Sequence, residues 1–154
     1  MSVTEHHGAE TLRKLIRTFV RRFGLLDQSH TPCGMPMTVS DAHALMELLH
    51  SSGIEPLELS RRLGLSKSAV SRLLLRLKRR GHIRQERSKE DGRAYSLYLT
   101  DKGIRTAKTI DQESLRLFGK ILSGIPEREA KKLLDSLPIL IRAISESHRT
   151  LDAE

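Results

Sequence analysis

Residues 54–100 read IEPLELSRRLGLSKSAVSRLLLRLKRRGHIRQERSKEDGRAYSLYLT, and this stretch decides the fold. Its leucine spacing predicts a short helix over 57–63, a tight turn at 64–66 and a longer basic helix over 67–80. Two short runs that alternate like strands follow, separated by a charged tip that contains glycine. Helix, turn, basic helix and hairpin in this order predict a winged helix-turn-helix.

The net charge of the chain is concentrated in the same stretch. Residues 55–100 hold 12 Lys/Arg and 5 Asp/Glu, a balance of +7, whereas the whole chain carries +8. Basic charge confined to one helix and one hairpin indicates a surface that meets a polyanion. Aromatic residues make up only 3% of the chain, which argues against binding of single strands or RNA by base stacking.

The length, the cysteine count and the absence of certain motifs limit the class of protein. A length of 154 residues predicts a single domain over 1–154. The single cysteine, Cys33, excludes an internal disulfide and predicts a cytoplasmic protein. No apolar run approaches a membrane span and the start lacks a signal-peptide pattern, so no membrane partner is expected. The sequence has no phosphate loop, nucleophile elbow or His-Glu-x-x-His pattern, so we expect neither an enzyme nor a cofactor.

Amphipathic helices are predicted on both sides of the winged module, which spans 38–100 and includes a helix over 40–50. Apolar residues recur at helical spacing over 9–28 and over 101–149, with a kink or break expected at Pro138. Residues 1–8 are expected to fray.

The flanking stripes carry more apolar surface than the small module can cover. We therefore expect the flanking helices to form a homodimer, because apolar surface buried between chains is stabilising. A two-fold dimer presents two basic helices to pseudo-palindromic double-stranded DNA.

Residues 57–103, LELSRRLGLSKSAVSRLLLRLKRRGHIRQERSKEDGRAYSLYLTDKG, resemble the MarR family of transcriptional regulators. Asp91-Gly92-Arg93 is similar to the family's Asp-x-Arg wing motif, and Leu99-Thr100-Asp101-Lys102-Gly103 follows at the family's spacing. The resemblance implies a mainly α fold, an obligate dimer and binding of duplex DNA. It also implies repression that is relieved by a small phenolic or other ligand, by oxidation or by metal. The family's ligand pockets lie between the DNA-binding lobe and the dimer helices.

The candidate DNA contacts are polar positions of the basic helix and the wing. The resemblance implies that the helix over 67–80 enters the major groove and that Arg93 enters the minor groove, oriented by Asp91. Arg72 and Arg76 are suited to read guanine or to hold phosphates. The candidates are Ser66, Lys67, Ser68, Ser71, Arg72, Arg76, Arg79, Arg87, Lys89, Asp91 and Arg93, with Lys78, Arg80 and Arg84 as further phosphate contacts.

Metal or redox sensing is a weaker alternative. The peroxide-sensing branch of the family places its cysteine early in the first helix, whereas Cys33 lies in the following loop. The zinc-sensing branch also needs histidines after the wing, and residues 101–122 contain none. His30, Cys33, Asp41 and His43 therefore stay weak metal candidates, and Cys33 a weak redox candidate.

Two further functions stay open at this point. The chain could be an architectural protein that binds DNA of any sequence. It could also be a protein-interaction module that has lost DNA binding.

Overall fold

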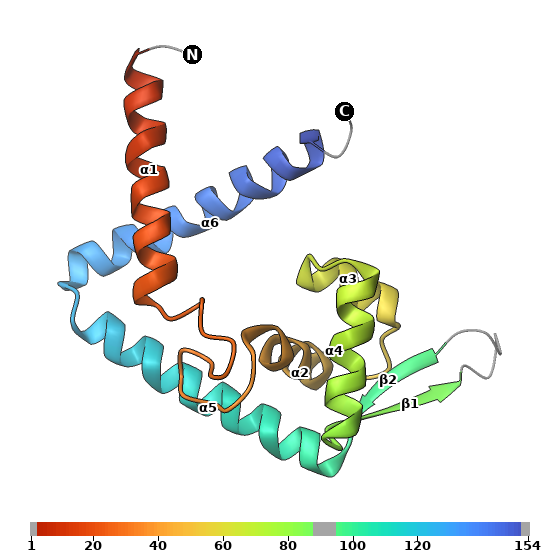
Figure 1. Cartoon of the computed structure of the whole chain (residues 1–154). Coiled ribbons are helices and arrows are strands. Elements are labelled where there is room, and N and C mark those ends of the chain that lie inside the picture. Colours follow the sequence, from red (N-terminus) through yellow and green to blue (C-terminus); the bar gives the residue numbers. More distant parts are fainter. Residues whose placement is uncertain (1–2, 88–94, 152–154) are drawn as a thin grey trace. The chain divides into compact units, whose positions relative to one another are not determined.

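The computed structural model describes residues 3–87 and 95–151. The chain divides into two compact units, Met1–Ser114 and Leu115–Glu154. Figure 1 shows the helices and the antiparallel hairpin in chain order. The elements are α1 (Val3–Arg22), α2 (Val39–His50), α3 (Pro56–Leu63), α4 (Lys67–Arg79), β1 (Ile83–Arg87), β2 (Tyr95–Leu99), α5 (Asp101–Ser123) and α6 (Glu127–Leu151). The predicted fold class, mainly α with a winged helix-turn-helix, is confirmed.

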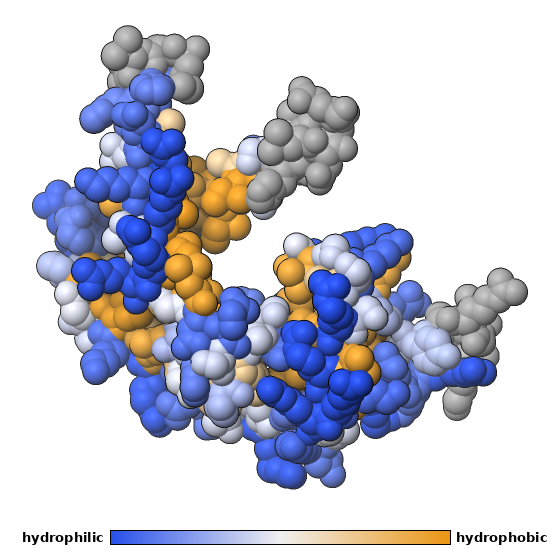
Figure 2. All heavy atoms as spheres, in the orientation of Figure 1, coloured by the Kyte–Doolittle hydropathy of each residue, from blue (hydrophilic) through white to orange (hydrophobic). Residues whose placement is uncertain are grey.

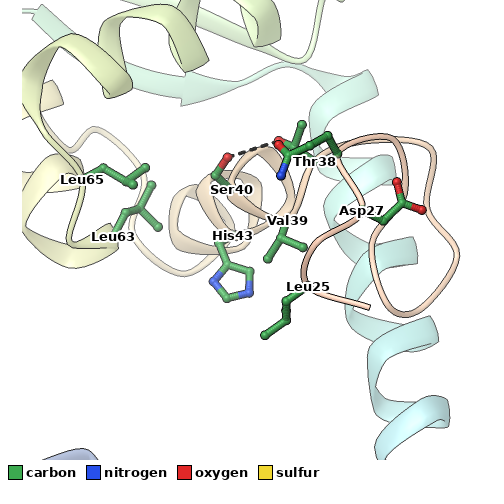
Figure 3. A pocket seen from close by; sticks show the side chains of 9 residues that line it. Leu25, Asp27, Thr38, Val39, Ser40, His43, Leu63 and Leu65 are labelled. Atoms are coloured by element: carbon green, nitrogen blue, oxygen red, sulfur yellow. Dashed lines mark hydrogen bonds between the residues drawn. The ribbon is translucent and has the colours of Figure 1, made fainter. Parts of the chain in front are cut away.

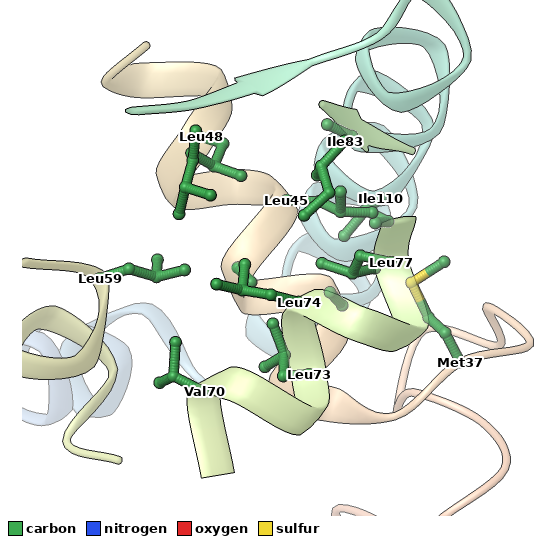
Figure 4. Close-up of a cluster of buried hydrophobic side chains, with 14 residues drawn as sticks. Met37, Leu45, Leu48, Leu59, Val70, Leu73, Leu74, Leu77, Ile83 and Ile110 are labelled. Carbon is green, nitrogen blue, oxygen red and sulfur yellow. The ribbon is translucent and has the colours of Figure 1, made fainter. Parts of the chain in front are cut away.

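The core of the first unit lies where α2, α3 and α4 pack against one another and against the hairpin. Apolar residues at helical spacing on α2 and α4 bury one face of each helix. Figure 4 shows their side chains pointing toward one another, with Ile110 of α5 closing the cluster. The largest fully buried side chains are Leu45, Leu48, Leu59, Leu73, Leu77, Leu97, Val70 and Asp41.

Local signals set the boundaries of the helix-turn-helix. Gly64 has a left-handed backbone (φ 61), which costs a residue without Cβ little, and it turns the chain after α3. Ser66 caps α4, because its hydroxyl accepts a hydrogen bond from the Ala69 amide at 3.2 Å. Thr38 caps α2 in the same way through the Asp41 amide. The predicted turn at 64–66 is confirmed.

The hairpin is joined to the helices by a bridge that the sequence did not predict. Strands β1 and β2 pair antiparallel with Ile83 opposite Leu99. Leu97 also forms a bridge with Ile54, donating to the Ile54 carbonyl at 2.9 Å and accepting from the Gly53 amide at 2.9 Å. The connection between α2 and α3 therefore pairs with the middle of β2 on the edge that faces away from β1, which ties the hairpin to the helices.

The predicted ends of the first helix are wrong. Helix α1 already begins at Val3, where Glu5 in the first turn suits the helix dipole, so the expected fraying does not extend through residue 8. It ends at Arg22 instead of 28. The chain turns at Gly24 (φ 80), and the Leu25 amide donates to the Val20 carbonyl at 3.1 Å.

A kink or a break was predicted at Pro138, and the break does not occur. Helix α6 continues through this residue to Leu151. A proline removes one backbone donor from the helix. The helical turns on both sides keep their own hydrogen bonds, so the helix continues.

Helix α5 passes close under the junction of α4 and β1 at Gly103. A methyl group at this position would overlap the carbonyl oxygen of His82. Thr100 caps the helix there, accepting from the Gly103 amide at 3.1 Å and donating to the Gly81 carbonyl at 2.7 Å. The close approach requires glycine.

Replacing Gly103 with alanine is expected to lower the free energy of unfolding by about 1–3 kcal/mol, because the methyl group forces backbone apart. Urea denaturation at fixed protein concentration measures the change. The control is Gly119→Ala in the same helix, where an added Cβ meets nothing within 4 Å. Alanine favours helix by up to ~1 kcal/mol there, so equal destabilisation by both variants would contradict the explanation.

Candidate nucleic-acid interface

The outward face of α4 carries the cations of the predicted interface. Lys67, Arg72, Lys78 and Arg79 are all exposed. Among the described residues, no carboxylate pairs with any of these four side chains. The helix contains no acidic residue, so its positive N-terminal end and its cations add to one positive surface.

Serine hydroxyls lie at the start of this face. Ser66, Ser68 and Ser71 are exposed. The Ser66 hydroxyl caps the helix and lies 3.1 Å from the Ser68 hydroxyl. Ser66 therefore has a structural task in addition to its predicted one, whereas Ser71 has no hydrogen-bond partner within the described part of the chain.

Arg76 has a partner inside the protein. Its Nη2 donates to Asp41 Oδ1 at 2.7 Å and its Nε to Oδ2 at 3.3 Å. The Asp41 side chain is 1% exposed and the Arg76 side chain 42%. This fork-shaped ion pair joins α2 to α4. The guanidinium that was predicted to read guanine or to hold phosphates ties α4 to α2, and the sequence offered no signal for that pairing beyond an aspartate in the first turn of α2.

Arg62 joins α3 to α2 in a similar way. It donates to Glu58 Oε1 at 2.9 Å, to Ser51 Oγ at 2.8 Å and to Glu47 Oε2 at 3.4 Å. The hydrogen bond from Arg62 lowers the pKa of Glu58 below its usual value. Two arginines of the basic stretch are therefore neutralised internally, partly by Asp41 and Glu47, which lie outside residues 55–100.

The wing strands place further arginines on aromatic rings. The guanidinium of Arg84 lies 4.7 Å from the ring centroid of Tyr98 and pairs with Glu86. Arg87, a predicted contact, is exposed and lies 5.9 Å from the centroid of Tyr95. These cation–π contacts hold the arginines along the hairpin. The predicted contacts Lys89, Asp91 and Arg93 lie outside the described residues.

His82 lies between α4 and the wing and adds no charge to the surface. The residue is 6% exposed, and its Nδ1 has no hydrogen-bond partner among the described residues. Burial, assisted by the charges of Lys102 and Arg80, lowers the pKa of His82 below its usual value and so favours the neutral ring.

A pocket of about 310 Å³ opens beside the first turn of α2. Figure 3 shows its lining, which combines apolar side chains with the polar groups of Ser40 and His43. The loop before α2 supplies one wall and the turn before α4 another. The lining residues are Leu25, Asp27, Gln28, Thr38, Val39, Ser40, His43, Leu63 and Leu65.

The four weak metal candidates do not converge. The Asp41 carboxylate is bound to Arg76, His43 lines the pocket, and His30 hydrogen-bonds Ser29 at 3.0 Å. Cys33 is half-buried and its sulfur lies 3.2 Å from the Thr31 hydroxyl. No group of three or more His, Cys, Asp or Glu side chains suited to a metal ion occurs in the described part of the chain. No helix there is long and apolar enough to cross a membrane.

Comparison with known proteins agrees with this geometry. Residues 35–94 match the model of the MarR family. The HTH-type transcriptional regulator TtmR of Methylorubrum extorquens (strain PA1) is 33% identical over 93 residues, which is 60% of this chain and 47% of that protein. The chain thus spans about half the length of this curated relative.

Solved structures share the fold over nearly the whole chain. FabT of Streptococcus pneumoniae, in complex with DNA, has a TM-score of 0.67 and 22% identity over 94% of this chain and 96% of that one. PcaV of Streptomyces coelicolor, in complex with its natural ligand, has a TM-score of 0.68 and 23% identity over 96% and 98%.

The fold, with its cationic helix α4, defines the class of winged helix-turn-helix proteins. Over residues 35–94, the chain is similar to the MarR family of transcriptional regulators. The matched proteins are regulators and not enzymes, in agreement with the sequence-based prediction.

Replacing Arg76 with alanine is expected to lower the free energy of unfolding by roughly 3 kcal/mol, because it leaves the buried Asp41 carboxylate without a partner. The control is Arg72→Ala on the same helix, where an exposed side chain is removed and the change should stay within about 0.5 kcal/mol. Urea denaturation compares the two variants. A similar loss in both would show that the ion pair contributes nothing particular to stability.

Proposed function

We propose that this chain is a homodimeric transcriptional regulator that binds a pseudo-palindromic DNA site and represses until a small ligand releases it. The observation that carries DNA binding is the face of α4, where Lys67, Arg72, Lys78 and Arg79 are exposed without carboxylate partners among the described residues. Cations on one helical face of a winged helix suit phosphates and the edges of bases. Release from DNA by a ligand would regulate transcription.

The dimer is supported by apolar residues on the outer helices. Of the eighteen large apolar side chains exposed on described residues, fourteen belong to α1, α5 and α6. Figure 2 shows such side chains gathered along α6. Ile139, for example, is 69% exposed and Leu115 is 71% exposed. An apolar surface of this extent favours burial against a second copy.

A small-molecule effector is supported by the pocket beside α2. Its volume, about 310 Å³, is at the lower end of the range for small-molecule sites. His43 supplies a hydrogen-bonding group near the apolar side chains of Leu63 and Leu65. The pocket adjoins the helix turn that carries Asp41, so a ligand there is in a position to move the partner of Arg76.

The function is tested with operator DNA found by footprinting the intergenic region next to the chain's gene. The full-length protein is expected to bind this site as two chains per palindrome, and to prefer it over random-sequence competitor. Arg72→Ala should weaken binding by about 1–3 kcal/mol, roughly 5- to 150-fold, as measured by fluorescence anisotropy.

Arg128→Ala, an exposed arginine on α6, is the matched control and should bind as the wild type does. If random DNA displaced the operator with equal affinity, the chain would be an architectural DNA binder and not a sequence-specific regulator. Arg72→Ala with unchanged affinity, together with binding of one chain at a time, would favour the protein-interaction module.

The effector site is tested with a panel of small phenols. A compound that releases the wild-type chain from its operator is expected to bind His43→Ala about fivefold more weakly, since one hydrogen bond contributes about 1 kcal/mol. Isothermal titration measures both dissociation constants. His50→Ala, an exposed histidine at the other end of α2, serves as control, and equal weakening by both variants would place the ligand elsewhere.

A further inference from the structure

Leu75 is an unusual residue on the outward face of α4. The side chain is 49% exposed. All residues of α4 are described, and Leu75 is the one large apolar side chain on the exposed half of this helix. The other residues on that half are Lys67, Ser68, Ser71, Arg72, Lys78 and Arg79. A single exposed leucine needs no explanation by itself, but one surrounded by three cations on the proposed recognition helix does.

Helix geometry places Leu75 in the middle of this face. At about 100° per residue, Leu75 lies about 20° from Ser68 and about 40° from Arg79 around the helix axis. It lies about 150° from the centre of the buried side formed by Val70, Leu73, Leu74 and Leu77. Along the axis, Leu75 is about 10 Å beyond Ser68, which is about three base-pair steps of 3.4 Å.

The surface beside Leu75 is hollowed and partly apolar. A hollow of about 250 Å³ is lined by Ser71, Leu74, Leu75, Lys78 and Gln85. A second hollow, of about 390 Å³, shares Ser71, Leu74 and Gln85 and extends to Leu57 of α3. An apolar group that approaches α4 from outside would therefore meet Leu75 and the apolar wall behind it.

The charges around Leu75 restrict what can approach. Arg72, Lys78 and Arg79 surround the leucine, and α4 has no acidic residue. An apolar protein surface would leave these cations desolvated and unpaired, whereas duplex DNA supplies phosphates beside its base edges. In the major groove, the apolar group that distinguishes one base is the C5-methyl group of thymine.

We propose that Leu75 is a specificity-determining residue that packs against the methyl group of one thymine in each half-site. The proposal rests on the proposed DNA-binding function and adds a base identity to it. Arg76 is held by Asp41. In the third turn of α4, the side chain that faces the base edges is therefore Leu75, between the phosphate-binding side chains of Lys78 and Arg79.

The test compares thymine with deoxyuridine, which lacks the methyl group and keeps the same hydrogen-bonding edge. The full-length wild-type chain first selects its preferred duplexes from a random library, and each thymine of the selected site is then replaced with deoxyuridine in turn. We expect one thymine per half-site whose replacement weakens binding about fourfold, because one buried methyl group contributes about 0.8 kcal/mol.

The same series is measured with Leu75→Ala, which keeps an exposed, helix-favouring residue. In this variant the sensitive thymine should tolerate deoxyuridine without loss. Arg79→Ala is the control: it should bind more weakly to every duplex and with a smaller salt dependence, but keep the wild-type preference for thymine over deoxyuridine.

Three results would overturn the proposal. If deoxyuridine at every position left wild-type binding unchanged, the chain would make no contact with a thymine methyl group. This result does not depend on how any variant folds. A thymine preference that persists in Leu75→Ala would assign the contact to another residue. Failure of the wild-type chain to enrich any sequence would contradict the proposed function itself, which is a different outcome from enrichment without a methyl effect.

Discussion

The ion pair between Asp41 and Arg76 connects the core of the first unit to the surface that faces DNA in the proposed function. A buried carboxylate is stable only with a hydrogen-bonded partner of opposite charge. Arg76 provides that partner with two nitrogen atoms and is thereby fixed toward α2. The orientation of α4 then follows from this pair and from the leucines on its buried side, while the cations on its outward side stay available to a partner.

Internal pairing changes the meaning of the charge balance. The +7 of residues 55–100 counts Arg62 and Arg76, which are bound to Glu47, Glu58 and Asp41. The surface of α4 nevertheless stays positive because its remaining cations have no such partners among the described residues. Adding up the charges along the sequence locates a basic region. Two of the carboxylates that neutralise part of it, Asp41 and Glu47, lie on α2, and their distance in sequence does not indicate with which arginines they pair.

Most of the helix-turn-helix could be predicted because its signals are local. A glycine that turns the chain and a serine that caps the next helix act within a few residues, and the structure has the turn where the sequence predicts it. The ends of α1 and the bridge between Ile54 and Leu97 were not predicted, and of the two alternatives at Pro138 the break does not occur. The bridge was missed because it joins segments far apart in sequence. The end of α1 was missed because the turn residue Gly24 lies inside an apolar pattern.

By itself, the sequence determined the order of the helices and the wing, since periodicity and turn residues act over short distances. The tertiary structure alone decided which cations are free, that Arg76 holds α4 in place, and that Leu75 stands beside a hollow surrounded by positive charge. These properties depend on which side chains from separate elements come within hydrogen-bonding or van der Waals distance. Packing determines that arrangement, because side chains from separate elements meet only when the elements pack together in the core.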